Sequence, residues 1–184
     1  MGEDGSMRFL VAAALLAWPL YAGELKPQTL EAFDRYIRQT EQRLDARTTF
    51  LWADESAARA QRVRQGQIAV EPFGPRPETS VPDGLVHDWV GSIFIPGATL
   101  AKTLAVMQDY DHKEAYRPEV MASRTLSRNG NDFHVYMRLL KKKVITVVLD
   151  TEHDVHYFQV GPEKWRSISR TTRIAEVERP GKPD

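Results

Sequence analysis

The sequence contains no cysteine and carries no net charge, and both absences narrow the classes of function. Its 184 residues include 25 Lys and Arg against 25 Asp and Glu. Without cysteine there is no disulfide, no thiolate nucleophile and no cysteine-ligated zinc site. Without a basic excess there is no electrostatic case for a nucleic-acid partner. The length and the ordinary apolar content predict about one globular domain.

Two motifs that serve enzymes are also missing. No serine stands in a Gly-x-Ser-x-Gly elbow, and there is no glycine-rich phosphate loop. The acidic stretch "QDYDHKEAY" (108–116) lacks the glycine and the ligand spacing of a calcium loop, so it is interpreted as a polar turn. We therefore expect no catalytic residue, no metal site and no cofactor.

The N-terminus has the pattern of a signal peptide. In "MRFLVAAALLAWPLYAGE" (7–24), a basic Arg8 precedes an apolar run that Pro19 ends, and small residues follow at 22 and 23. The run is too short to span a bilayer of about 30 Å. We predict a signal peptide over residues 1–23, with 1–6 as extra start residues, and export to the periplasm or the cell exterior. A buried or interfacial helix is the alternative.

Residues 24–70 predict a helical segment. An amphipathic helix has Leu30, Phe33, Ile37 and Leu44 on one stripe, with Thr29 as its N-cap. A second helix is expected from Asp54 to Gly66. Residues 71–84 contain four prolines and two glycines and predict a linker.

Residues 85–184 predict the main domain. A strand over 85–97 turns His87, Trp89, Gly91 and Ile93 to one face, and a helix follows over 97–116 with Leu100, Leu104 and Met107 inward. The Asn129-Gly130 pair predicts a hairpin between the next two strands. Strands joined in sequence by short turns give an antiparallel sheet, so the fold class is α+β.

Lys141, Lys142 and Lys143 interrupt a stretch rich in β-branched residues. Because strands are usually about 5–6 residues long, we expect one strand to end at Leu140 and the next to begin at Val144, with the lysines at the corner. A bulged, bent strand and a basic site for an anionic ligand remain alternatives.

The stretch "GSIFIPGATLAKTLAVMQDYDHKEAYRPEV" and the hairpin "SRTLSRNGNDFHVYMRLLKKKVITVVL" resemble the START-like (SRPBCC, helix-grip) superfamily, from about Leu85 onward. The resemblance implies an antiparallel sheet that wraps a long C-terminal helix, with a hydrophobic pocket between them. Its members include polyketide cyclase-like and coenzyme-Q-binding-like proteins. No long amphipathic helix follows "RIAEVERPGKPD", so we expect the domain at 85–184 to be incomplete and one apolar face to be open.

Six side chains combine an apolar body with a polar tip, as small-molecule pockets usually do. These predicted ligand-binding residues are Trp89, Tyr116, His134, Tyr136, Arg138 and Trp165. An arginine in an apolar strand either faces solvent or meets an anion, and the sequence leaves open which face of the strand lines the pocket.

A second polar group occurs in "TEHDVHYF" (151–158). Glu152, Asp154 and His156 share one face of a strand, and His153 lies on the other. The triplet is a metal-site candidate that is better interpreted as a solvent-exposed face. His153 is either a pocket polar group or a core histidine with satisfied hydrogen bonds.

These observations favour the binding or transport of a hydrophobic small molecule, such as a lipid or a quinone. Membrane contact during ligand transfer stays open, and the sequence does not fix the oligomeric state. Two alternatives are kept: a cyclase- or hydrolase-like enzyme on the same fold, and an interaction domain without a ligand.

Overall fold

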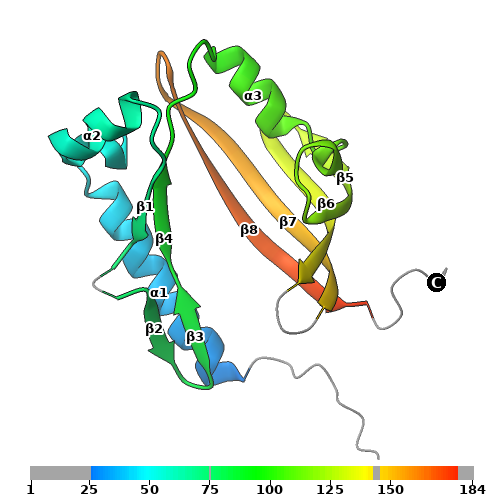
Figure 1. Ribbon diagram of the computed structural model, residues 1–184. Helices are drawn as coiled ribbons and strands as arrows, with labels where there is room; N and C mark the ends of the chain where they lie inside the picture. The colour runs from blue at the N-terminus through cyan, green and yellow to red at the C-terminus, as the bar shows by residue number, and fades with distance from the viewer. Residues whose placement is uncertain (1–25, 75, 143–145, 178–184) are drawn as a thin grey trace, which may run out of the picture.

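The computed structural model describes residues 26–74, 76–142 and 146–177. An N-terminal helix is followed by antiparallel sheets, so the predicted α+β class is confirmed (Figure 1). The predicted signal peptide and Lys143 lie outside the described residues. None of the described helices combines the length and the apolar character needed to cross a membrane.

The N-terminal part contains α1 (Pro27–Asp45), a 3-10 turn η1 (Trp52–Glu55) and α2 (Ala57–Arg64). Pro27 occupies the first turn of α1, where its fixed φ and missing N–H carry no penalty. The predicted N-cap Thr29 is wrong: Lys26 is the cap. The buried Thr29 hydroxyl instead donates to the Pro82 carbonyl at 2.9 Å.

The second helix begins later than predicted. Ser56 caps α2, and its hydroxyl accepts from the Arg59 N–H. The helix ends before Gly66, whose φ of 85° suits a glycine after a helix. A small core forms here, built from Trp52, Ala53, Val63 and Ala69.

Two short ribbons follow. β1 (Ala69–Pro72) pairs with β4 (Trp89–Ser92), and β2 (Glu78–Val81) pairs with β3 (Gly84–His87). The predicted linker at 71–84 therefore contains half of a hairpin. The single strand predicted over 85–97 is wrong, because it divides at Asp88 into strands of two different sheets. The Asp88 carboxylate accepts a hydrogen bond from Tyr36 of α1 at 2.8 Å, which holds the chain at this division.

The main sheet has the order β5-β6-β7-β8 and is antiparallel throughout. Its strands are β5 (Val120–Asn129), β6 (Asp132–Lys142), β7 (Thr146–Gly161) and β8 (Lys164–Glu176). The Asn129-Gly130 hairpin is confirmed, with Gly130 at φ 59°. β6 continues to Lys142, two residues beyond the predicted end, and β7 begins at Thr146. Lys141 and Lys142 are therefore the last residues of β6, paired with Val147 and Thr146, and the strand end predicted at Leu140 is wrong.

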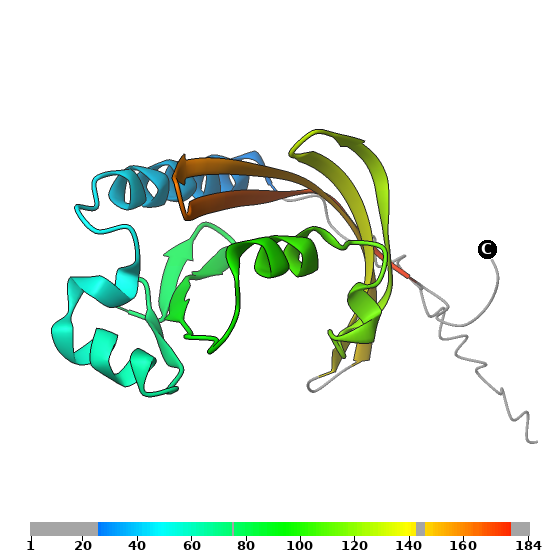
Figure 2. The same ribbon diagram turned by 90° about the horizontal axis from the view of Figure 1, so that it is seen from above.

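α3 (Leu100–Gln108) and the turn η2 (Lys113–Ala115) connect β4 to β5. The helix predicted over 97–116 is therefore shorter than expected. Figure 2 shows α3 in front of one face of the curved sheet. The main core lies between them and consists of Tyr110, Phe133, Val135, Val155 and Tyr157. A helix followed by a curved antiparallel sheet is compatible with a helix-grip fold.

Candidate ligand-binding hollow

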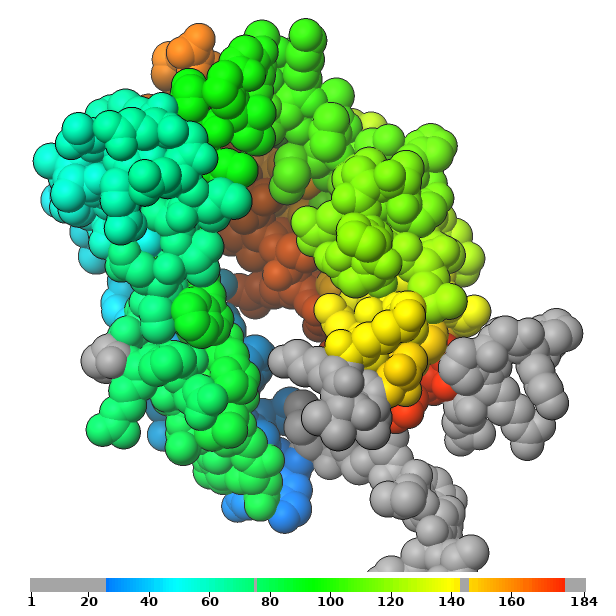
Figure 3. Space-filling view, in the orientation of Figure 1, coloured from blue at the N-terminus to red at the C-terminus, as the bar shows by residue number. Residues whose placement is uncertain are grey.

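The main sheet has two faces of different character. Side chains alternate along each strand, so Val135, His153 and Val155 share the face that α3 covers in part. We call this the inner face. His134 and Asp154 lie on the opposite face, which we call the outer face. Figure 3 shows a hollow over the inner face, between the sheet and the β1–β4 ribbon.

Helix α1 closes the side of the hollow between the ribbons and β8. Thr29 and Tyr36, two turns apart, donate hydrogen bonds to the β2–β3 turn and to the β3–β4 junction. Glu41 and Asp45, one turn apart, form ion pairs of 2.6 and 2.8 Å with arginines of β8. The helix is therefore held from two directions.

The apolar stripe of α1 points between those two directions. At about 100° per residue, Leu30, Phe33 and Ile37 fall in the sector that separates the ribbon contacts from the β8 contacts. Leu30 is 44% exposed and Phe33 is 43% exposed. Atoms of α1 (blue) are visible at the lower end of the hollow in Figure 3. The stripe predicted from the sequence thus faces the space between the ribbons and β8.

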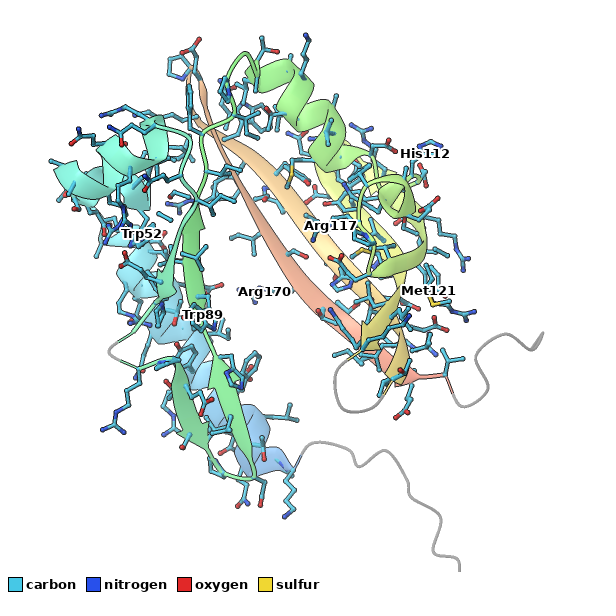
Figure 4. The ribbon with its side chains drawn as sticks, in the orientation of Figure 1. Trp52, Trp89, His112, Arg117, Met121 and Arg170 are labelled. Atoms are coloured by element: carbon cyan, nitrogen blue, oxygen red, sulfur yellow. The ribbon has the colours of Figure 1, made fainter. Side chains whose placement is uncertain are left out.

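The β1–β4 ribbon forms a second wall. Val90 packs against the small N-terminal core, so its neighbour Trp89 faces away from that core. Val70 lies on the same face as Trp89, and both side chains are more than half exposed. Figure 4 shows Trp89 on β4, beside the hollow. An exposed tryptophan next to an exposed valine is an unusual pair for a surface without a partner.

α3 and β8 supply the remaining walls. Leu104 packs on the main core, whereas Met107, on the same stripe of α3, remains 48% exposed. Trp165 of β8 also packs against the core. Further along the inner face of β8, Ile174 lies opposite Thr151 and is 65% exposed.

His153 lies near the centre of the inner face, between the hydroxyl groups of Thr151 and Thr171. It is half-buried, and its register partner on β6 is Val135, which is fully buried. Its Nε2 lies 2.9 Å from the Thr151 hydroxyl, and its Nδ1 lies 3.1 Å from the Thr171 hydroxyl. Burial lowers the pKa of His153, so the neutral imidazole is the stable form at neutral pH.

Charged side chains on the outer face pair with one another. Arg138 donates to both oxygens of Asp150, at 2.7 and 2.8 Å, and the Tyr136 hydroxyl donates to the same carboxylate at 2.6 Å. These bonds, with that to Arg138 the strongest, lower the pKa of Asp150 to about 2. The same carboxylate raises the pKa of Arg138. Arg138 therefore pairs with a carboxylate, which was one of the two environments expected for an arginine in an apolar strand.

An open groove of about 560 Å³ also lies on the outer face, with His134 and His156 in its lining. His134 lies 2.7 Å from Asp154, and His156 contacts Asp132. Both histidines of the groove therefore already have carboxylate partners within it. In the described part of the chain no three His, Asp or Glu side chains are grouped to hold a metal ion, the triplet at 152, 154 and 156 included.

Tyr116 forms hydrogen bonds at the C-terminal end of α3. Its hydroxyl lies 2.9 Å from the Asp109 carbonyl and 3.1 Å from the Val106 carbonyl, and it accepts from Lys113 Nζ at 3.0 Å. Carbonyls at the last turn of a helix have no partner within it, so Tyr116 and Lys113 cap α3.

The structure divides the six predicted ligand-binding residues. Trp89 and Trp165 lie on the hollow, Tyr116 caps α3, and the other three, His134, Tyr136 and Arg138, lie on the outer face. Sequence reasoning did not assign Ile174 or the α1 stripe to the site. The amphipathic period of α1 predicted an apolar stripe on the helix. It did not predict which surface that stripe would face.

Comparison of the chain with protein-family models, with curated proteins and with solved structures found no match. The interpretation of the hollow therefore depends on its own residues.

Proposed function

We propose that the hollow binds an apolar small molecule, as in the START-like (SRPBCC) domains that the sequence resembles. The supporting observation is that four separate elements around the hollow carry exposed apolar side chains. Phe33 of α1, Trp89 of β4, Met107 of α3 and Ile174 of β8 are between 43% and 65% exposed. Covering such side chains with a guest contributes about 25 cal/mol per Å² of apolar surface removed from water.

The polar groups of the inner face support binding over catalysis. A binding pocket needs few polar groups in apolar surroundings, whereas acid–base chemistry needs titratable groups that face one another. His153 bonds to two threonine hydroxyls rather than to a carboxylate. The Tyr110 and Tyr157 hydroxyls bond to each other within the core. A cyclase- or hydrolase-like activity is therefore the less supported function.

The test uses N-phenyl-1-naphthylamine, an uncharged apolar probe whose fluorescence rises when it leaves water. We expect saturable binding of about one probe per chain, with energy transfer from tryptophan. Two isoleucines of β8 offer a matched pair, because Ile174 lies on the inner face and Ile168 on the outer face.

Ile174→Ser should weaken probe binding about fivefold, since burial of part of an isoleucine is worth about 1 kcal/mol. Ile168→Ser should leave the affinity unchanged. Binding that does not saturate, or an equal loss in the two variants, would contradict the proposal. Native mass spectrometry of protein from its own host, after organic extraction, would then identify the natural guest.

Export is a separate proposal, and the signal-peptide pattern of residues 1–23 supports it. N-terminal sequencing of the protein from its host should find a mature chain that begins near Gly23 or Glu24. A chain that retains residues 7–22 in the cytosolic fraction would contradict this proposal. Exchange of a lipid-like guest with a membrane is compatible with either location.

A further inference from the structure

We propose that His153 binds a hydroxyl group at the polar end of the apolar guest, accepting its hydrogen bond through Nδ1. This inference rests on the proposed function of the hollow and specifies its ligand as an apolar alcohol or phenol. A chain of hydrogen bonds holds the imidazole of His153.

The chain fixes which ring nitrogen carries the proton. The Thr151 hydroxyl donates its single proton to the Met137 carbonyl at 2.9 Å. Toward His153 the same oxygen can therefore only accept, so Nε2 of the imidazole must be the donor across their 2.9 Å contact. Thr151 is 3% exposed, which keeps water from replacing either bond.

With its proton on Nε2, a neutral imidazole has a lone pair on Nδ1. This nitrogen accepts from the Thr171 hydroxyl at 3.1 Å. Thr171 is exposed on β8, the edge strand of the sheet, so a guest hydroxyl can take its place at little cost. Burial lowers the pKa of His153, which keeps this acceptor unprotonated at neutral pH.

The surroundings of His153 make this acceptor selective. Val135 lies directly across the strand pair, and Val155 follows two residues along the same face. A guest group without a donor would leave Nδ1 with only the Thr171 hydroxyl. A guest hydroxyl that takes the place of Thr171 keeps Nδ1 bonded beside Val135 and Val155, while the displaced Thr171 hydroxyl turns to water.

The test compares decan-1-ol with 1-methoxydecane as competitors of N-phenyl-1-naphthylamine at pH 8. Both have the same alkyl chain and one oxygen, but only the alcohol has an O–H. The ratio of their affinities is measured in the natural protein and in His153→Phe, so that differences in aqueous solubility cancel. We expect the alcohol preference to fall about fivefold in His153→Phe.

Thr171→Val is the matched control, because it alters the neighbouring side chain and keeps His153. Because it removes the hydroxyl that competes for Nδ1, this variant should show an alcohol preference at least as strong as that of the natural protein. An equal loss in Thr171→Val and His153→Phe would assign the anchor to the threonine and overturn the proposal, as would an unchanged preference in His153→Phe.

A measurement without mutation tests the tautomer. Long-range ¹H–¹⁵N spectra of the His153 ring should show the proton on Nε2, and a proton on Nδ1 would overturn the proposal. If the probe itself fails to bind saturably, the proposed function of the hollow fails as well. If the probe binds and only the alcohol preference is missing, the hollow remains a binding site and this inference alone is wrong.

Discussion

Two buried tyrosines, Tyr110 and Tyr157, form a hydrogen-bond chain that ends on α3. Comparing their phenylalanine variants tests how this chain holds α3 on the sheet. The Tyr157 hydroxyl donates to the Met107 carbonyl of α3 at 3.0 Å and lies 2.7 Å from the Tyr110 hydroxyl. Because the Tyr157 proton is used on Met107, Tyr110 must donate to Tyr157. Burial raises the pKa of both tyrosines, so both hydroxyls keep the protons that this order requires.

Removal of either hydroxyl has a different consequence. Tyr157→Phe deletes the bond to Met107 and leaves the Tyr110 O–H, on a residue only 7% exposed, without an acceptor. We expect a loss of about 2–3 kcal/mol in the free energy of unfolding, because a buried donor without a partner adds its desolvation cost to the lost bond. Tyr110→Phe keeps the Tyr157–Met107 bond and should cost about 1 kcal/mol.

Urea unfolding of the two variants and of the double variant, followed by tryptophan fluorescence, provides the measurement. Trp165 packs against the same core and should report its loss. The double variant should cost less than the sum of the two single ones, because Tyr110→Phe removes the donor that Tyr157→Phe leaves unpaired. A Tyr110→Phe cost equal to or above that of Tyr157→Phe would refute the proposed order of donors.

Two further predictions concern the charged and titratable groups. A double-mutant cycle of Arg138→Ala and Asp150→Asn should give a coupling of about 1 kcal/mol in urea unfolding, since the pair is bidentate but only partly buried, and probe binding should not change. The free energy of unfolding should fall as the pH drops below 6.5, because unfolded His153 takes up a proton before folded His153 does, and His153→Phe should remove this step. It should fall again between pH 3.8 and about 2, where Asp150 protonates in the unfolded chain first, and Asp150→Asn should remove that step. Because Asp109 raises the pKa of His112, which has the opposite effect over this range, the comparison with His153→Phe decides: equal pH dependence of the two proteins from pH 7.5 to 5.5 would contradict the first of these pH effects.

Local chemistry predicted much of the fold. Asn129-Gly130 marked its hairpin because glycine adopts a positive φ without steric cost, and Gly130 does so here. The alternation of side chains correctly separated His153 from Glu152 and Asp154. These features depend on neighbouring residues, which a single sequence displays directly.

The features that sequence reasoning missed are contacts between distant segments. The apolar pattern of 85–93 continues across Asp88, yet the strand divides there, where Tyr36, 52 residues away, bonds to the carboxylate. Likewise, a period of two residues shows that His134 and Arg138 share a face but not that this face is the outer one. Only the position of α3 over the opposite face decides that question.

The contrast between the two faces of the sheet leads to a last prediction. On the outer face, Arg138 of β6 and Arg173 of β8 form ion pairs with carboxylates of β7. On the inner side, Ile174 and Trp89 are exposed beyond what a partnerless surface favours. A guest that covers these side chains binds the folded chain and not the unfolded one. It must therefore raise the free energy of unfolding. At a free probe concentration of 100 times Kd, the free energy of unfolding should rise by about 2.7 kcal/mol for N-phenyl-1-naphthylamine. The rise should be the same in Ile168→Ser, whereas Ile174→Ser should need about five times more probe to reach it. Stabilisation that is equal in both variants at every concentration would mean that the probe binds elsewhere.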